Sequence, residues 1–240
     1  MPSRDTKIGA RRARATRAAL GLDPCAPLAC VLTTVERDAG LPVVVARLDD
    51  GVAGCCVRSG AAAVLFVNGA DAPGRRRFTL AHEYGHVACG HDRATWVDSA
   101  EVLAGRTRDG REVQANAFAA EFLAPRDGVA ELLDGEPDLE AVVRIAARFG
   151  LSSIAALNRL GTLGATRRYD RLRAEIDAGD HQHVWDYLAP PMVDDELARI
   201  DALPRLSPAL EGSELAAMLR GDAPATGAPA LRRGLAVIAR

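Results

Sequence analysis

The chain has 240 residues, of which 48% are hydrophobic and 26% charged, and its formal net charge is −2. This length fits one large domain or a domain with an extension, and the composition suffices for a sizeable buried core. The near-neutral charge argues against bulk binding to nucleic acid, and no apolar run reaches the roughly 18 residues of a membrane span. Five cysteines, an odd number without a secretory signal, predict reduced thiols and a cytoplasmic protein.

The first third of the sequence predicts two helices followed by a small sheet. Turn signals at Asp49-Asp50-Gly51 and Ser59-Gly60 separate three short runs of strand-forming residues. The predicted elements are helices at residues 11–20 and 27–39 and strands at residues 42–48, 52–58 and 62–67. Short turns predict a mostly antiparallel sheet, in which the adjacent Cys55 and Cys56 face opposite sides.

Two longer helices are predicted after the sheet. Residues 75–86 repeat apolar side chains at three- and four-residue steps, with Pro73-Gly74 before them and Gly90 after them. Residues 111–125 are rich in helix formers and end at a proline. Between the helices, residues 91–110 form a long polar stretch, which we expect to be a loop bordering a cleft. The predicted fold class is α+β, with the sheet packed against these two helices.

The first of these helices carries an H-E-x-x-H motif, His82-Glu83-Tyr84-Gly85-His86. Residues four apart lie on one helical face, so the two imidazoles can bind a single Zn²⁺. Glu83 lies about 100° around the helix from His82 and can take the proton of a zinc-activated water without being a ligand. The motif predicts a hydrolase that attacks peptide carbonyls; the alternative is two histidines packed on a helix face.

Two histidines do not complete a zinc site, and the sequence offers three candidates for the third ligand. His91 follows His86 by five residues, one fewer than the long zincin motif requires. Cys89 has nearly the same helical angle as the first histidine, although cysteine is more often a buried core residue. Glu112 lies on the next helix, and Asn116 follows it by one turn, where an amide can hold a ligand in place.

The two helices read R-R-F-T-L-A-H-E-Y-G-H over residues 76–86 and E-V-Q-A-N-A-F-A-A-E-F-L-A-P over residues 112–125. These blocks resemble the ImmA/IrrE-type metallopeptidases, which usually read R-R-F-T-L-A-H-E-L-G-H and E-x-E-A-N-x-F-A-A-x-L-L-M-P. The departures are Tyr84 for leucine, Gln114 for glutamate, and F-L-A for L-L-M. A looser similarity extends from about Arg12 to about Gly164.

The resemblance implies a zinc peptidase with a specific protein substrate. The implied zinc ligands are His82, His86 and Glu112. Glu83 would be the general base and Asn116 would support a ligand, while Tyr84 and His91 are candidates for stabilising the oxyanion or lining the cleft. By the same resemblance, the substrate would be a helix-turn-helix transcriptional repressor, whose cleavage relieves repression of stress-response or mobile-element genes.

Two other functions fit the same sequence: a non-catalytic regulator that binds DNA or a partner, and a component of a toxin–antitoxin pair. The intact Glu83 favours the enzyme. Residues 139–161 have the spacing of a helix-turn-helix, with Gly150 in the turn, but the second helix offers only Asn158 and Arg159 to read DNA. Direct DNA binding is therefore not expected, and a packed helical hairpin is the favoured interpretation.

The predicted domains are a metallopeptidase domain at residues 1–164, with the hairpin at 138–164, and a helical, partly irregular extension at residues 165–240. Residues 166–187 read as one helix, and residues 231–239 could form an amphipathic docking helix. We expect a chain ending near Gly164 to fold and to keep its zinc site, unless Trp185 and Tyr187 anchor the extension across the core.

Overall fold

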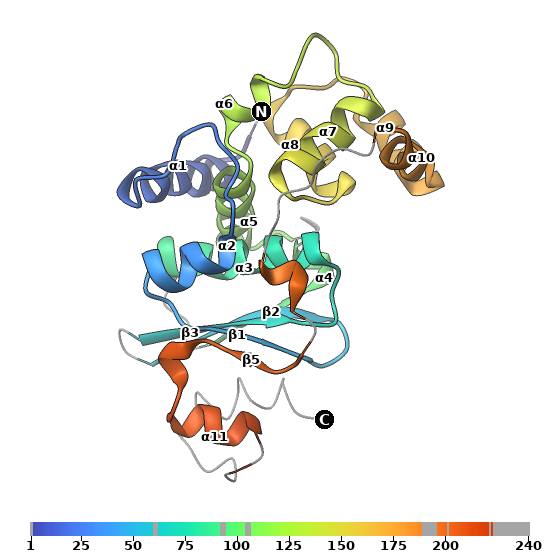
Figure 1. The fold of residues 1–240 in the computed structure, drawn as a ribbon. Helices are drawn as coiled ribbons and strands as arrows, with labels where there is room; N and C mark the ends of the chain where they lie inside the picture. The colour runs from blue at the N-terminus through green and yellow to red at the C-terminus, as the bar shows by residue number, and fades with distance from the viewer. Residues whose placement is uncertain are drawn as a thin grey trace.

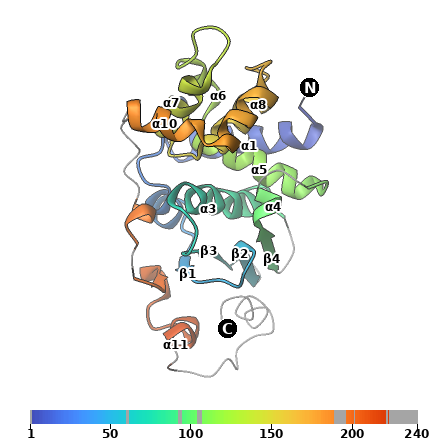
Figure 2. The same ribbon diagram turned by 90° about the vertical axis from the view of Figure 1, so that its right-hand side faces the viewer.

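The computed structural model describes residues 2–59, 62–91, 95–103, 107–188, 196–200, 202–220 and 222. A sheet lies beneath a layer of helices, and further helices cover that layer on the side away from the sheet (Figures 1 and 2). A late segment of the chain returns below the sheet. This arrangement confirms the predicted α+β class. Within the described ranges, no helix is both long enough and apolar enough to cross a membrane.

The sheet has five strands in the order β4-β2-β3-β1-β5. The strands are β1 (Val43–Ala46), β2 (Val52–Ser59), β3 (Ala62–Asn68), β4 (Thr95–Ser99) and β5 (Arg205–Leu206). The pair β1–β3 is parallel, while β2–β3, β2–β4 and β1–β5 are antiparallel. The prediction of a small, mostly antiparallel sheet is therefore confirmed, and the three strands predicted from the sequence are β1, β2 and β3.

Helical segments make up most of the remaining described structure. They are α1 (Arg4–Ala19), α2 (Val31–Thr33), the π-helical η1 (Thr34–Asp38), α3 (Pro73–Ala88), α4 (Ala100–Leu103), α5 (Gly110–Leu123), α6 (Arg126–Ala130), α7 (Leu139–Phe149), α8 (Ser153–Leu163), α9 (Tyr169–Ala178), α10 (Asp180–Leu188), η2 (Glu196–Arg199), η3 (Pro208–Leu210) and α11 (Glu214–Arg220). The two helices that carry the sequence motifs are α3 and α5, as predicted.

The sheet separates two hydrophobic clusters, because alternate residues of a strand face opposite sides. Val43 and Val45 belong to the large cluster beneath the helices, whereas Val44 belongs to a smaller cluster below the sheet. Cys56 and Cys55 divide in the same way, as predicted. Residues of η3 and α11 cover the smaller cluster, so the sheet is the middle layer of the molecule.

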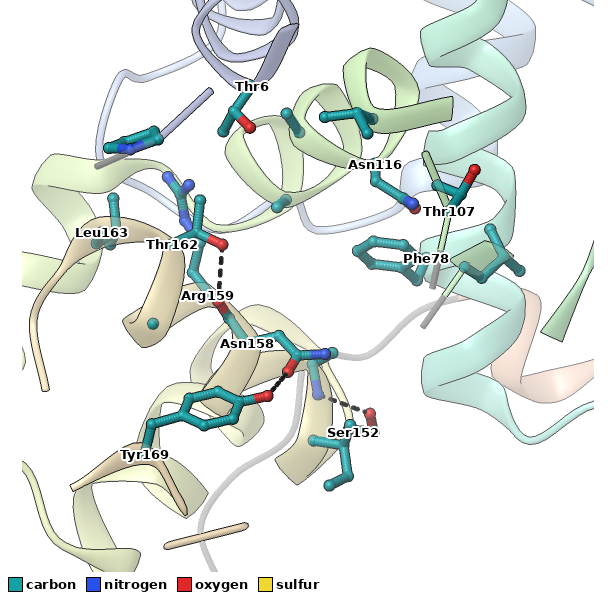
Figure 3. A pocket seen from close by; sticks show the side chains of 18 of the residues that line it. Thr6, Phe78, Thr107, Asn116, Ser152, Asn158, Arg159, Thr162, Leu163 and Tyr169 are labelled. Atoms are coloured by element: carbon teal, nitrogen blue, oxygen red, sulfur yellow. Dashed lines mark hydrogen bonds between the residues drawn. The ribbon is translucent and has the colours of Figure 1, made fainter. Parts of the chain in front are cut away.

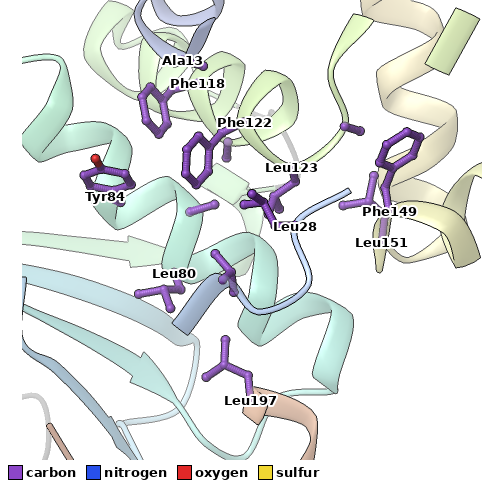
Figure 4. Close-up of a cluster of buried hydrophobic side chains, with 14 of the residues drawn as sticks. Ala13, Leu28, Leu80, Tyr84, Phe118, Phe122, Leu123, Phe149, Leu151 and Leu197 are labelled. Atoms are coloured by element: carbon purple, nitrogen blue, oxygen red, sulfur yellow. The ribbon is translucent and has the colours of Figure 1, made fainter. Parts of the chain in front are cut away.

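Small residues let the helices above the sheet approach one another closely. A Cβ at Gly9 of α1 would lie 2.1 Å from the backbone oxygen of Gln114 in α5, and a Cβ at Gly85 of α3 would lie 3.1 Å from the ring of Phe118. Phe118 and Phe122 of α5 stack with ring centroids 5.3 Å apart and fill the space above α3 (Figure 4). The relative positions of α3 and α5 are therefore fixed by close packing.

The first two helices differ from their predicted bounds. The first begins at Arg4 rather than near residue 11, because the Ser3 side chain caps it by accepting a hydrogen bond from the backbone nitrogen of Thr6 at 3.1 Å. The predicted helix at residues 27–39 is the short α2 followed by η1. Cys30 caps α2 through its sulfur, which leaves the preceding residues outside the helix.

Two further predictions were wrong about local structure. The stretch 91–110, predicted as a loop, contains β4 and α4, because β4 pairs with β2, about 40 residues earlier in the chain, and has no strong local pattern. The single helix predicted at residues 166–187 is two helices, α9 and α10. Gly179 has a φ of 92°, a left-handed conformation that ends α9.

Part of the C-terminal segment packs into the large cluster. Leu172, Ile176 and Leu197 are at most 5% exposed there. Trp185 donates a hydrogen bond to Ser153 Oγ at 3.1 Å, whereas Tyr187 is 77% exposed and anchors nothing. The boundary between residues 1–164 and 165–240 stays a prediction, and the suggested docking helix at 231–239 lies outside the described residues.

Candidate metal centre

Three buried donor atoms meet between α3 and α5. The Nε2 atoms of His82 and His86 are 3.0 Å apart, and Glu112 Oε2 lies 3.3 Å from the first and 3.4 Å from the second. The residues are at most 6% exposed, and they form a group that can hold a metal ion. The helical spacing of the two histidines and the packing of α5 on α3 create this convergence.

The size of this triangle fits a small metal ion. A tetrahedral zinc ion with bonds of about 2.0–2.1 Å has its donors about 3.3 Å apart. The three observed separations, 3.0, 3.3 and 3.4 Å, are close to that value. Two imidazole nitrogens and one carboxylate oxygen are also donors that zinc accepts. The geometry and the chemistry of the donors therefore fit a metal.

Glu83 follows His82 in the sequence and is fully buried on the side of α3 that faces the sheet. A Cβ at Gly54 of β2 would lie 2.8 Å from Glu83 Oε1 and 2.5 Å from Thr79 Cγ2. Gly54 therefore leaves the space that the carboxylate occupies. The need for glycine at this position comes from the packing of α3 on β2 and was not predicted.

The side chain of Asn116 contacts His82. Its Oδ1 lies 3.0 Å from His82 Nδ1, and its Nδ2 donates to the backbone oxygen of Val102 at 2.7 Å. The carbonyl can only accept, so the amide nitrogen must face it and Oδ1 must face the imidazole. His82 then carries its proton on Nδ1, which leaves Nε2 free of a proton and able to bind a metal.

His91 meets His86 on the side away from the donor triangle. The two Nδ1 atoms are 2.8 Å apart, and His91 Nε2 lies 3.3 Å from Gln114 Oε1. Burial, and then the neighbouring His86, hold the pKa of His91 below its ordinary value. This position favours a role for His91 in supporting His86. It disfavours the two roles that the sequence left open for His91, third ligand and oxyanion group.

Two other candidates also lie away from the triangle. The ring of Tyr84 packs edge-on against Phe118 and Phe122 in the large hydrophobic cluster, with centroids 5.4 and 5.5 Å away (Figure 4). Tyr84 is two residues from His82, which on a helix is the opposite face. Among the described residues, the group of donors that can hold a metal does not include Cys89, and burial raises the pKa of its thiol to about 11.

A cavity of about 830 Å³ adjoins the centre, between α5 and α8 (Figure 3). Phe78 of α3, Asn116 of α5 and Ile154 of α8 line it. Tyr169 also lines it and donates to Asn158 Oδ1 at 2.6 Å. Because the amide of Asn116 contacts both the cavity and His82, an occupant of the cavity would touch a residue that orients the centre.

The fold and these donors fit a metallopeptidase. A family model, that of the IrrE N-terminal-like domain, a peptidase family, matches residues 38–161, just over half of the chain. The chain belongs to this family, which confirms the resemblance seen in the sequence. It is also 35% identical over 99 residues to the "Radiation response metalloprotease IrrE" of Deinococcus radiodurans. That match covers 40% of this chain and 30% of the relative, so the chain corresponds to less than a third of the relative's length.

Proposed function

We propose that this chain is a zinc-dependent metalloendopeptidase, with His82, His86 and Glu112 as ligands and Glu83 as general base. The observation that carries the proposal is the convergence of three buried donor atoms, 3.0 to 3.4 Å apart, on a helix that also carries the buried carboxylate of Glu83. Catalytic zinc sites commonly have three protein ligands and an open position. When bound, zinc acts as a Lewis acid and lowers the pKa of water to about 7.

Glu83, Asn116 and His91 would each have a separate role in the reaction. Glu83 takes the proton of the attacking water and returns it to the amine of the leaving peptide. Its burial against β2 limits its movement and lowers the local dielectric, which strengthens its interaction with nearby charge. Asn116 and His91 hold the two imidazoles in orientation.

The substrate in this proposal is a protein, specifically a helix-turn-helix repressor whose cleavage relieves repression in a stress or mobile-element response. The cavity beside Asn116 supports a protein substrate, since its volume of about 830 Å³ and its mixed apolar and amide lining suit several side chains. The name of the Deinococcus relative, a radiation response metalloprotease, is consistent with the stress role.

A regulator that reads DNA through α8 is disfavoured by the contacts of its two candidate residues. Arg159 is 3% exposed and pairs with Glu121 Oε2 at 2.5 Å. Asn158 accepts a hydrogen bond from Tyr169. Arg159 is buried and Asn158 is half-buried, and both side chains are engaged within the protein, so neither is presented for reading bases as in a recognition helix.

The first experiment separates metal binding from catalysis. We expect purified parent protein to contain about one zinc per chain, Glu112→Ala to lose most of it, and Glu83→Gln to retain it. Incubated with a helix-turn-helix repressor that the parent protein cleaves, Glu83→Gln should cleave about 10²–10⁴-fold more slowly than the parent, because only the proton acceptor is removed. Cleavage by Glu83→Gln at the parent rate would exclude this mechanism.

A second experiment tests the cavity as the place where substrate binds. Thr162 lines the cavity and is exposed, so Thr162→Trp should fill it without disturbing the core. We expect KM for the repressor to rise about tenfold with kcat and zinc content unchanged. Arg148→Trp, on the exposed face of α7 outside the cavity, is the matched control. Equal KM values for the two variants would place the substrate elsewhere.

A further inference from the structure

Four polar side chains, linked by hydrogen bonds, connect the N-terminal helix to the candidate metal centre. Asp5 of α1 accepts a hydrogen bond on Oδ1 from Gln114 Nε2 at 2.7 Å. Gln114 Oε1 lies 3.3 Å from His91 Nε2, and His91 Nδ1 lies 2.8 Å from His86 Nδ1. The far nitrogen of His86 is one corner of the donor triangle. The other three residues each lie 80 positions or more after Asp5 in the sequence.

Asp5 determines which group donates and which accepts in every hydrogen bond of this series. A carboxylate only accepts, so Asp5 requires the NH₂ group of Gln114 to face it. Gln114 then presents its oxygen to His91, which must carry a proton on Nε2 and accept on Nδ1. His86 must therefore donate from Nδ1, and its Nε2 is left without a proton.

We propose that Asp5 is a positioning residue that, through Gln114 and His91, sets the tautomer in which His86 can bind a metal. The proposal rests on the proposed function in one respect, that His86 is a ligand. The corresponding link to His82 ends on the backbone oxygen of Val102, which no substitution removes. The series that leads to His86 begins instead at a side chain, so its influence on the tautomer of His86 can be tested by substituting Asp5.

The packing of α1 keeps Asp5 in place. Gly9 lies one turn after Asp5 on the same face of α1, and it is the residue that touches the backbone of Gln114. A Cβ at Gly110, at the start of α5, would lie 3.0 Å from Asp5 Oδ2. The two helices thus approach closely at both ends of this contact, which holds the carboxylate against the amide.

A structural role is the alternative explanation of Asp5. It lies in the first turn of α1, where an acidic side chain stabilises a helix by interacting with its dipole. Asp170 occupies the same kind of position in α9 and is exposed. Asp170→Leu is therefore a matched control, because it removes an interaction with a helix dipole and leaves the hydrogen bonds from Asp5 to His86 unchanged.

The experiment measures the tautomers and the metal affinity of the full chain. In metal-free protein, long-range ¹H–¹⁵N spectra of the five histidines should show a proton on Nδ1 of His86 and on Nε2 of His91. Asp5→Leu should reduce the share of this His86 tautomer and weaken zinc binding, measured by chelator competition, about fivefold, the effect of one neutral hydrogen bond. Asp5→Asn should give intermediate values, since its amide can accept from Gln114 but can also donate to it. Asp170→Leu should change neither.

Two results would overturn the inference. One is an Asp5→Leu protein with parent tautomers and parent zinc affinity. The other is an equal loss of affinity in Asp5→Leu and Asp170→Leu, which would show a general effect on helix stability. A parent protein that binds no zinc would instead contradict the proposed function, and the tautomer measurement would still decide the role of Asp5.

Discussion

Replacing Arg159 by methionine should lower the free energy of unfolding by about 3–5 kcal/mol, because it leaves a buried charge without its main partner. Arg159 and Glu121 connect α8 to α5, and their side chains are 2% and 3% exposed. Arg159 also donates to the backbone oxygen of Ala124 at 2.9 Å. Burial lowers the pKa of this guanidinium, and the charge of Glu121 counteracts the effect.

The contacts that remain after the substitution set the size of the effect. Glu121 would keep Arg14 Nη1 at 3.3 Å, but the Arg14 side chain is 55% exposed and can offset only part of the loss. A typical domain is stable by about 5–15 kcal/mol, so the expected loss is a large share of the total. In Arg159→Met/Glu121→Leu neither buried charge remains, and we expect that variant to lie within about 1–2 kcal/mol of the parent.

Urea unfolding of the parent, both single variants and the double variant would measure the pair as a thermodynamic cycle. The control is Arg144→Met, which breaks an exposed pair with Glu140 in the same hairpin and should cost at most about 0.5 kcal/mol. A loss below about 1 kcal/mol for Arg159→Met would refute the argument, because it would mean that water reaches Glu121 or that α8 does not pack on α5 in this way.

Two further predictions concern the sheet and the C-terminal segment. Gly54→Ala should cost about 1–3 kcal/mol and reduce peptidase activity while zinc remains bound, because its Cβ would lie 2.8 Å from Glu83 Oε1; parent stability and activity in this variant would show that α3 does not pack on β2 as described. A chain ending at Gly164 should keep the three ligands and bind zinc but melt at a lower temperature, since burial of each of Leu172, Ile176 and Leu197 contributes about 1.5–3 kcal/mol. An insoluble or zinc-free truncation would place the C-terminal segment in the peptidase domain.

The sequence alone was sufficient for the helix that carries His82, Glu83 and His86. The spacing of these residues is a local property, because any α-helix brings positions four apart to one face. The strands β1, β2 and β3 were predicted for a similar reason, since their residue types and the turns between them are local signals. The choice of Glu112 came from resemblance to a family, and the residues by themselves left His91 and Cys89 open.

Tertiary structure decided the features that depend on contacts between distant residues. β4 forms because β2 is beside it, and Gly54 must be glycine because α3 lies over β2. The role of His91 depends on Gln114, which in turn is oriented by Asp5, 109 positions earlier. No local pattern encodes such contacts, because they exist only after α1, α3 and α5 have packed together. The sequence therefore determined which groups can do the chemistry, and packing determined which of them meet and which atoms they present.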